Sequence, residues 1–268
     1  MLRDITLGQY YQTDSLLHRM DCRVKLVGTF AFLISLFVVD NVWGYLLAAA
    51  FLGLCIRLSH VPFKFMVKGL KAILFLLLFA LVFNLFLTPG TPVVRIWKLT
   101  ITQEGIVIAA KMAVRLILLI IGSSLMTLTT TPNHLTDGLE SLLNPLKKLK
   151  VPVHEIAMMM SIALRFIPIL MEETDKIMKA QIARGADFES GNLIERAKAM
   201  VPLLVPLFIA AFRRANDLAM AMEARCYRGG EGRTKMKPLI YKRRDYLAYA
   251  ALGLYLAAAV VVGRILPL

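Results

Sequence analysis

The stretch Gly105–Thr130, GIVIAAKMAVRLILLIIGSSLMTLTT, decides the fold class of this chain. A helix needs roughly 20 mainly apolar residues to cross about 30 Å of hydrocarbon, and this stretch is longer than that and carries only Lys111 and Arg115 as charges. The whole chain has 268 residues, 58% of them hydrophobic, and a mean hydropathy of +0.65. Those values are too high for an ordinary soluble domain. The sequence therefore predicts an integral membrane protein.

Four further apolar stretches qualify or nearly qualify as spans, at Val24–Val39, Val42–Ile56, Ala72–Leu87 and Tyr246–Leu266. The first two are short and are separated only by Asp40-Asn41, so together they predict a tight helical hairpin. Lys25 and Arg57 then extend their long side chains to one interface. We expect an all-α integral membrane protein with about five transmembrane helices.

Charged loops give these spans an orientation. Basic residues crowd the connection between the second and third spans, namely Arg57, Lys64, Lys68 and Lys71. The positive-inside rule places this loop and the N-terminus in the cytoplasm, the 88–104 loop outside and Pro132 to Arg244 inside. The prediction is a four-span bundle at 1–131, a cytoplasmic domain at 132–244 and a C-terminal span at 245–268. Net charge +14 fits anionic headgroups better than nucleic acid in so apolar a chain.

Lys111 and Arg115 lie four residues apart, on one face of the fourth span. Charges inside a membrane are costly and usually point into a bundle or a wet cavity. One interpretation is a contact with a transported solute or a partner. We favour a structural pair near the outer end that bonds to backbone carbonyls of neighbouring helices.

The predicted cytoplasmic domain contains an amphipathic helix from Leu135 and two longer helices. One runs from Val153 to Arg184 with Pro168 inside, and the other ends at Arg225 with Pro202 and Pro206 early. Their apolar halves look too short or too interrupted to cross upright, so we expect them beneath the bundle or partly inserted. The run Met158, Met159 and Met160 either offers a soft surface to a partner helix or fills an irregular core.

Two short motifs end these long helices, Ala183-Arg184-Gly185 and Ala224-Arg225-Cys226. A cation at a helix C-terminus is favourable by roughly 0.3–1 kcal/mol, so a single arginine there means little. Two such endings in similar surroundings favour docking on a partner, because the planar guanidinium can bond bidentately to carbonyls or carboxylates. We predict that both arginines are docking residues.

Other chemistry is sparse in the sequence. It has no GxxxxGK[ST] motif, so we expect no ATP bound through a P-loop in this chain. The four histidines make no i,i+4 pair for a metal, and Cys22, Cys55 and Cys226 predict neither a disulfide framework nor a zinc site. We expect no catalytic residues, cofactor or metal, and hence a non-enzymatic protein.

The chain resembles the transmembrane T component (EcfT, CbiQ-like) of energy-coupling factor (ECF) transporters over nearly its whole length. The matching residues are Gly8-Gln9-Tyr10, Asp14-Ser15, His18-Arg19, Asp21, Arg23, Lys25, Leu135-Thr136-Asp137-Gly138-Leu139, Met158 to Pro168, and the two Ala-Arg motifs. This sequence has Cys226 where the family's second motif has Gly, and Cys22 where the N-terminal motif often has Pro. Because of Cys226, we expect two related docking points that are not equivalent.

The resemblance implies a membrane bundle joined to cytoplasmic coupling helices in the cytoplasmic membrane of a bacterium. Two ABC-type ATPase subunits, identical or different, would bind ATP and receive the motifs, Ala183 to Gly185 on one and Ala224 to Cys226 on the other. A membrane S component would carry a vitamin or another micronutrient and contact the apolar helix halves, including Met158 to Met160. ATP-driven movement of the coupling helices would then reorient the S component.

Two other classes of protein are open on the residues alone. A substrate-binding transporter subunit acting without ATPase partners would need a polar pocket at the bilayer midplane. A membrane enzyme would need a cluster of acids, His or Ser near an interface. The polar residues of this chain gather instead in the 132–244 segment.

Overall fold

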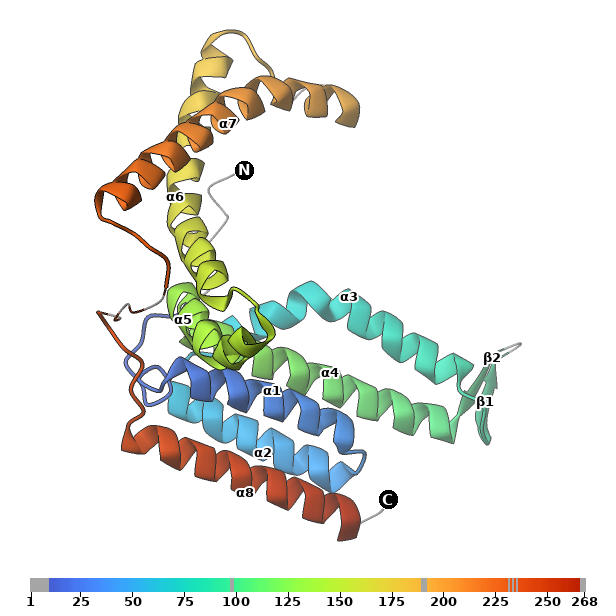
Figure 1. Ribbon diagram of the computed structural model, residues 1–268. Coiled ribbons are helices and arrows are strands. Elements are labelled where there is room, and N and C mark those ends of the chain that lie inside the picture. The colour runs from blue at the N-terminus through green and yellow to red at the C-terminus, as the bar shows by residue number, and fades with distance from the viewer. Residues whose placement is uncertain are drawn as a thin grey trace. The chain divides into compact units, whose positions relative to one another are not determined.

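The structure is a computed structural model that describes residues 10–96, 99–188, 192–230, 232, 234 and 236–265 (Figure 1). Its helices are α1 (Cys22–Val38), α2 (Val42–Ser59), α3 (Phe63–Leu87), α4 (Gln103–Thr129), α5 (Pro132–Leu143), η2 (Asn144–Leu149), α6 (Val153–Ala183), α7 (Leu193–Ala224) and α8 (Arg243–Ile265). Gly8 and Gln9 of the N-terminal motif and Leu266 of the last predicted span lie outside the described residues. The helical fold class is confirmed.

The chain divides into two compact units. The bundle unit comprises the described residues of Gly8–Gly138 and Leu239–Leu268, and the two-helix unit comprises those of Leu139–Pro238. Each unit is described by itself below.

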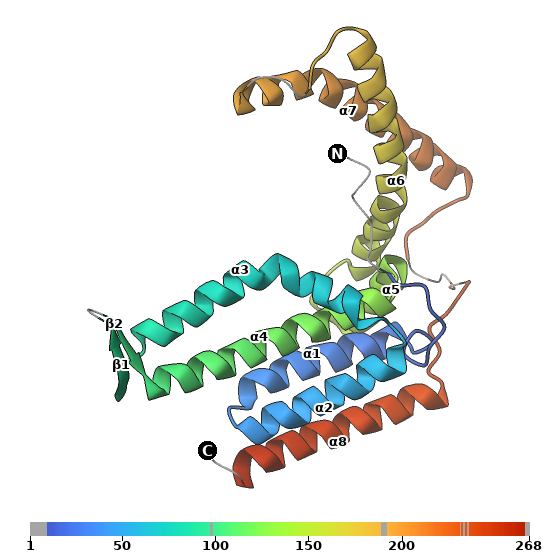
Figure 2. The ribbon, with the colours of Figure 1, turned by 180° about the vertical axis from the view of Figure 1, so that it is seen from behind.

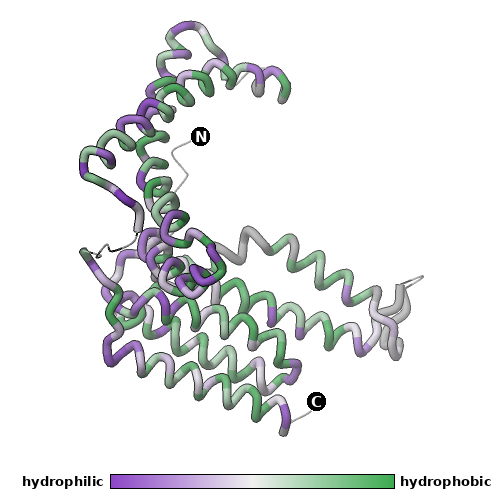
Figure 3. The backbone as a smooth tube through the Cα atoms, in the orientation of Figure 1, coloured by the Kyte–Doolittle hydropathy of each residue, from purple (hydrophilic) through white to green (hydrophobic). Residues whose placement is uncertain are grey.

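In the bundle unit, α1, α2, α4 and α8 lie side by side, and α3 packs along α4 (Figures 1 and 2). Apolar side chains from these helices form one core, in which Leu36 and Met66 have no exposed surface. Aromatic rings add to it, since Phe51 and Tyr255 stack with their centroids 4.4 Å apart. The hydropathy pattern in Figure 3 runs apolar along these helices and polar near their ends. This distribution suits a bundle surrounded by lipid.

A two-stranded antiparallel hairpin joins α3 to α4, and the sequence analysis did not predict it. Strand β1 (Pro92–Ile96) pairs with β2 (Leu99–Thr102), with Ile96 opposite Leu99. Thr102 then caps α4, because its hydroxyl accepts a hydrogen bond from the backbone N–H of Gly105 at 3.1 Å.

Five helices are long and apolar enough to span a membrane, as expected in number, and three of them, α2, α4 and α8, are predicted spans. The five are α2, α4, α6, α8 and the Lys198–Ala224 part of α7 among the described residues. The helix α1, with 17 residues, is at the lower limit for a span. The prediction that the apolar half of α6 is too short to cross a membrane is wrong by length and composition, because it belongs to a helix of 31 residues that meets both criteria for a span. The prolines of α7 likewise lie inside the helix.

Buried polar contacts tie the start of α1 to the start of α8. Asp245 is 1% exposed, and its carboxylate accepts hydrogen bonds from the backbone N–H groups of Asp21 (2.9 Å) and Lys242 (2.7 Å). Asp21 caps α1 and pairs with Arg23 at 2.9 Å, while the Arg23 guanidinium lies over the Tyr241 ring. Burial raises the pKa of the Asp21 carboxyl, but the hydrogen bonds from Arg23 outweigh it, so this pKa is lowered.

At the other end of the bundle, Arg115 is a structural residue. Its guanidinium bonds to the Asp40 carboxylate at 2.6 Å and to the Tyr45 hydroxyl at 3.0 Å. The expected partners were backbone carbonyls, and that detail is wrong because the α1–α2 turn brings Asp40 within reach. The pair links α4 to the α1–α2 hairpin, as the structural interpretation requires for Arg115, and the same interpretation of Lys111 stays a prediction.

Candidate functional site

The candidate site is built on α6 and α7, which cross and contact one another in the two-helix unit (Figures 1 and 2). A salt bridge of 2.9 Å between Arg214 and Glu173 joins them. Pro206 has no N–H, so the carbonyl of Pro202 has no intrahelical donor. The side-chain amide of Gln181 on α6 donates to this carbonyl at 3.5 Å. The proline that weakens α7 thus also supplies an attachment point for α6.

The first motif forms the end of α6. Ala183 is the last helical residue, Arg184 is the C-cap and Gly185 follows in the left-handed conformation at φ 89°. The N–H of Gly185 donates to the carbonyl of Ile182 at 2.9 Å, and the N–H of Ala186 donates to that of Gln181 at 3.0 Å. These two bonds define a Schellman motif, which satisfies carbonyls that the helix end leaves without donors.

The second motif ends α7 with the same pattern. Arg225 is the C-cap, the N–H of Cys226 donates to the Glu223 carbonyl at 2.8 Å, and the N–H of Tyr227 donates to the Met222 carbonyl at 3.0 Å. Cys226 takes the left-handed position at φ 55°. The two helix ends therefore share one hydrogen-bond pattern, and the expectation that the two docking points are not equivalent stays a prediction. The difference that remains is energetic, since a left-handed residue other than Gly costs roughly 1–2 kcal/mol.

Both arginines extend from these ends with exposed side chains. In the part of the chain that the structure describes, neither guanidinium forms a hydrogen bond or an ion pair with another residue. Each lies beside the negative end of its helix dipole, which favours the cation without engaging its five N–H donors. The structure thus presents two fixed turns of equal shape, each carrying one uncommitted guanidinium.

Comparison with known proteins agrees with these features. The family model described as "Cobalt transport protein" (CbiQ) matches residues 13–236. The energy-coupling factor transporter transmembrane protein EcfT of Ruminiclostridium cellulolyticum is 59% identical over 247 residues, which cover 92% of each chain. The EcfT of Clostridium kluyveri is 55% identical over 99% of this chain and 98% of its own, and that of Bacillus subtilis is 51% identical over 91% and 93%.

This chain belongs to the EcfT family. It is a transmembrane component of an energy-coupling factor transporter, which agrees with its membrane-spanning helices. No group of three or more His, Cys, Asp or Glu side chains that could hold a metal occurs among the residues the structure describes.

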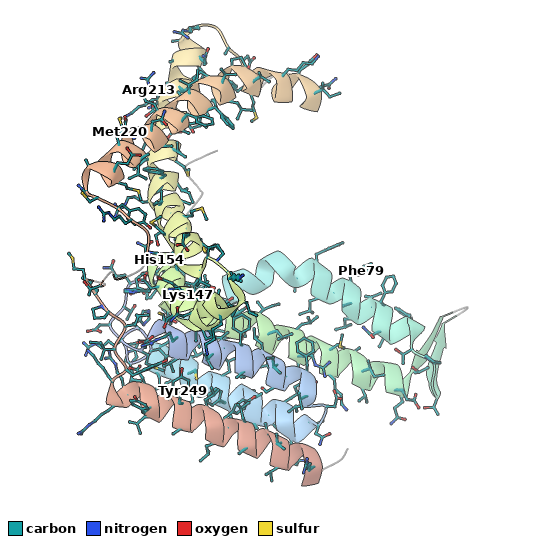
Figure 4. All side chains as sticks on the ribbon, viewed as in Figure 1. Phe79, Lys147, His154, Arg213, Met220 and Tyr249 are labelled. Atoms are coloured by element: carbon teal, nitrogen blue, oxygen red, sulfur yellow. The ribbon has the colours of Figure 1, made fainter. Side chains whose placement is uncertain are left out.

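The methionine run of this EcfT family member lies in the first turns of α6. Met159 is 57% exposed and Met160 is 42% exposed, whereas Met158 is half-buried. Of the two alternatives for this run, surface and core filler, the structure gives the surface position to Met159 and Met160. Figure 4 labels His154 just before them, where its Nδ1 lies 2.9 Å from the Glu140 carboxylate at the base of the unit.

A larger apolar surface on α7 was missed by the sequence analysis. We call it the α7 stripe, and its members are all at least half exposed: Val201, Leu204, Val205, Phe208, Ile209 and Phe212. Their spacing of three and four residues puts them on one helix face. The sequence contains this helical spacing, but Pro202 and Pro206 lie within it and favoured the interpretation of an interrupted helix. Exposed apolar patches of this kind mark contacts with lipid or another protein.

Proposed function

We propose that this EcfT family member is the non-catalytic coupling subunit of an ECF-type ABC importer. Arg184 and Arg225 would each dock on one of two cytoplasmic ATPase subunits, which bind ATP. The movement of those subunits would be passed to a membrane S component that carries a vitamin or another micronutrient. The observation that carries the proposal is the repeated Schellman end with its exposed arginine on α6 and on α7.

Repetition matters because two related partners need two similar contacts. An ATPase pair presents the same or a closely similar groove twice, and two turns of equal backbone shape fit such a pair. Arginine suits the role because its planar fork bonds bidentately to carboxylates or to carbonyl groups. The fixed turn also lowers the entropy lost when the side chain docks.

Coupling requires that the two ends move together. The Arg214–Glu173 salt bridge and the Gln181–Pro202 bond hold α6 and α7 at their crossing. Displacement of one end therefore displaces the other helix through this crossing. The α7 stripe, with Met159 and Met160, supplies an apolar surface for the S component, and soft methionine contacts can slide and repack as that component reorients.

The proposed orientation has the N-terminus and both arginines on the cytoplasmic side. It is supported by the basic residues in the last turn of α2 and the first turns of α3, and by Lys147, Lys148 and Lys150, which are exposed around η2. Figure 4 labels Lys147 at this position. The compartment is then the cytoplasmic membrane of a bacterium, where ATP is available only on the inner side.

The test replaces Arg184 and Arg225 by Ala, singly and together, in a tagged chain expressed with its ATPase subunits and an S component. We expect each single change to lower the amount of ATPase that co-purifies by about tenfold, since buried arginine anchors often contribute 2 kcal/mol or more. Uptake of the radiolabelled substrate of that S component should fall in parallel, while the amount of chain in the membrane stays constant.

Arg213→Ala is the matched control, because Arg213 is an exposed arginine of α7 that is not at a helix end (Figure 4). It should leave both co-purification and uptake unchanged. Full uptake and an intact complex in the double variant would overturn the docking proposal. Specific vitamin binding by the isolated chain would instead favour a substrate-binding subunit that acts without ATPases.

A further inference from the structure

A groove of about 320 Å³ lies in the bundle unit between α1, α2, α4 and α8. Its lining is mostly apolar and includes Phe32, Leu52, Leu125 and Leu252. A Cβ atom added to Gly28, which also lines it, would have no atom within 4 Å. The volume is in the range of sites that bind small molecules, roughly 300–1,000 Å³. The groove is separate from the two helix ends and from the α7 stripe, because no residue of α6 or α7 lines it.

The two charged residues that line the groove lie at the same end of it. Lys25 is near the start of α1 and Arg244 near the start of α8, whereas Phe32 and Leu252 are about two turns deeper along the same helices. The seven residues from Lys25 to Phe32 rise about 10 Å in an α-helix. One leaflet of the hydrocarbon core is about 15 Å thick. The groove therefore has a cationic end and an apolar length of most of one leaflet.

In the described part of the chain, Arg244, at this end of the groove, has a buried hydrogen-bond donor without an acceptor. Its Nε is buried and has no hydrogen-bond partner among the residues that the structure describes. Lys25 donates from Nζ to the Thr129 carbonyl at 2.8 Å, and the positive charges of Lys25 and Arg244 act on one another. A buried donor without a partner costs about 1–3 kcal/mol, and more when the group is charged. An anion between the two cations would accept a hydrogen bond from the Arg244 Nε and would offset the repulsion between the charges of Lys25 and Arg244.

Carboxylates near this end are already engaged. Asp21 accepts the hydrogen bonds of Arg23, and Asp245 accepts the backbone N–H groups of Asp21 and Lys242. Among the residues that the structure describes, these carboxylates are not available to Arg244 and Lys25, and we therefore take the anion from outside the chain. The groove is open toward the side of the bundle, since Leu54 is 56% and Leu247 is 70% exposed. An occupant enters this groove from the bilayer itself.

We propose that the groove binds one anionic phospholipid from the leaflet on the side of the basic loops. Its phosphate accepts hydrogen bonds from Arg244 and Lys25, and one acyl chain lies along Gly28 and Phe32. An anionic headgroup fits better than a zwitterionic one, because no carboxylate of the site remains to pair with a choline or ethanolamine cation. A phospholipid there would fasten α8 to α1, α2 and α4.

The test uses the full chain purified in detergent and titrated with phosphatidylglycerol or phosphatidylcholine, with bound lipid counted by native mass spectrometry. Arg244→Gln removes the charge, and Gly28→Leu fills the groove with a side chain of the protein. Arg243→Gln and Gly53→Leu are the matched controls, since Arg243 is exposed and Gly53 also has open space around its Cβ position, but neither lines the groove.

We expect the wild-type chain to retain phosphatidylglycerol in preference to phosphatidylcholine. Arg244→Gln should weaken phosphatidylglycerol binding about fivefold, in line with the contribution of one basic residue at a membrane surface. Gly28→Leu should weaken the binding of both lipids, and the two controls should remain within twofold of the wild type. Thermal melting of each variant checks that the fold is kept, and the Gly28→Leu chain should melt no lower than the wild type.

Three outcomes would overturn the proposal. Equal loss in Arg243→Gln and Arg244→Gln would mean general surface attraction rather than a site. Unchanged phosphatidylglycerol binding in a folded Gly28→Leu chain would place the lipid elsewhere. Release of the bound lipid when partner subunits are added, with cross-linking of the Leu247→Cys variant to one of them, would mean that a partner helix fills the groove.

Discussion

The two units of this EcfT family member differ most in how many of their apolar side chains are buried in a core of their own. The bundle unit buries one set of large residues in a core, with Leu36 and Met66 at 0% exposure, and exposes another set on its outer surface, with Phe75 at 81%. Along α6 and α7 the buried hydrophobic residues are only Val153, Ala157 and Leu203 within the described part of the chain. In contrast, Phe208 and Phe212 on α7 are 65% and 64% exposed. The bundle is held together by its own core, whereas the two-helix unit presents its apolar side chains outward.

This difference separates stability from assembly. A helix that buries one face against its own chain gains its stability from packing, and a helix that leaves that face open gains it only when another molecule covers it. Substitutions in the bundle should thus change the folding of the isolated chain. Substitutions on the α7 stripe should change the complex, not the fold.

The largest effect on this comparison comes from matched Leu→Ala changes. Leu36→Ala removes a side chain with no exposed surface and should lower the unfolding free energy by about 2–4 kcal/mol, because it leaves a cavity in the core. Leu204→Ala removes one that is 50% exposed and should change it by less than about 0.5 kcal/mol. Unfolding of the isolated chain in detergent measures both.

For assembly of the complex, we expect Leu204→Ala to have the larger effect and Leu36→Ala the smaller one. Co-purification of the S component should fall for Leu204→Ala, while Leu36→Ala should affect it only in proportion to the folded chain that remains. The comparison would fail if Leu204→Ala destabilised the isolated chain as much as Leu36→Ala does.

A polar contact in the bundle should give the next largest effect. Asp245→Ala leaves the backbone N–H groups of Asp21 and Lys242 without their acceptor, which should cost about 2 kcal/mol or more, since each unsatisfied buried group costs roughly 1–3 kcal/mol. Thermal melting in detergent should show a clear decrease. Asp217→Ala is the control, because Asp217 is exposed on α7 and should leave the melting temperature unchanged.

The sequence predicted the bundle spans well because composition alone reports them. Apolar length, turn residues and loop charges all act locally, so Val42–Ile56 and Gly105–Thr130 are found in α2 and α4. It did not predict the Asp21–Asp245 contact, whose partners are 224 residues apart. No local pattern can report such a contact. The hairpin β1–β2 was missed for a different reason, since it is short and lies between two spans.

Prolines misled the interpretation of the two-helix unit. Pro168 was expected inside one long helix and Pro202 and Pro206 early in the other, and their apolar parts were judged too short or too interrupted to cross, because each proline removes one helical hydrogen bond. The helices continue through all three, and Gln181 of α6 serves the carbonyl that Pro206 leaves without a donor. The two motifs were located correctly at the helix ends. Their shared hydrogen-bond pattern was not predicted, because a residue other than Gly at position 226 left the backbone of the second helix end open.

The two helix ends offer a smaller, more exact test. Gly185→Ala puts a side chain at φ 89° and should open the end of α6, whereas Cys226→Gly removes one at φ 55° and should tighten the end of α7. Each substitution should change the free energy of opening of its helix end by about 1 kcal/mol, which is about fivefold in the opening equilibrium. Hydrogen exchange at the amides of Ala186 and Tyr227, which close the two turns, measures the opening.

The two variants should therefore change amide exchange in opposite directions. Faster exchange at Tyr227 in Cys226→Gly would contradict the assignment of strain to Cys226. Unchanged ATPase binding in Cys226→Gly would show in addition that Arg225, rather than the thiol, makes the contact.

The smallest expected effect concerns the crossing of α6 and α7. Glu173 and Arg214 form a salt bridge whose side chains are 27% and 37% exposed, so water screens it and it should contribute about 0.5 kcal/mol. A double-mutant cycle with Glu173→Gln and Arg214→Gln isolates that coupling. We expect little change in the stability of the isolated chain but slower transport in the complex, because the crossing then transmits movement less directly.

Reversing the charges separates a mechanical role from a purely electrostatic one. Glu173→Arg combined with Arg214→Glu keeps an ion pair at the crossing and should restore transport that either single reversal lowers. Asp175→Lys combined with Lys179→Asp is the control, because that pair reverses charges on α6 and neither residue forms a salt bridge among the described residues. If the reversed Glu173–Arg214 pair restored the ATPase complex but not uptake, the crossing would matter for binding and not for coupling. Rescue of both ATPase binding and uptake would mean that the crossing needs an ion pair of either polarity, and not these two residues in particular.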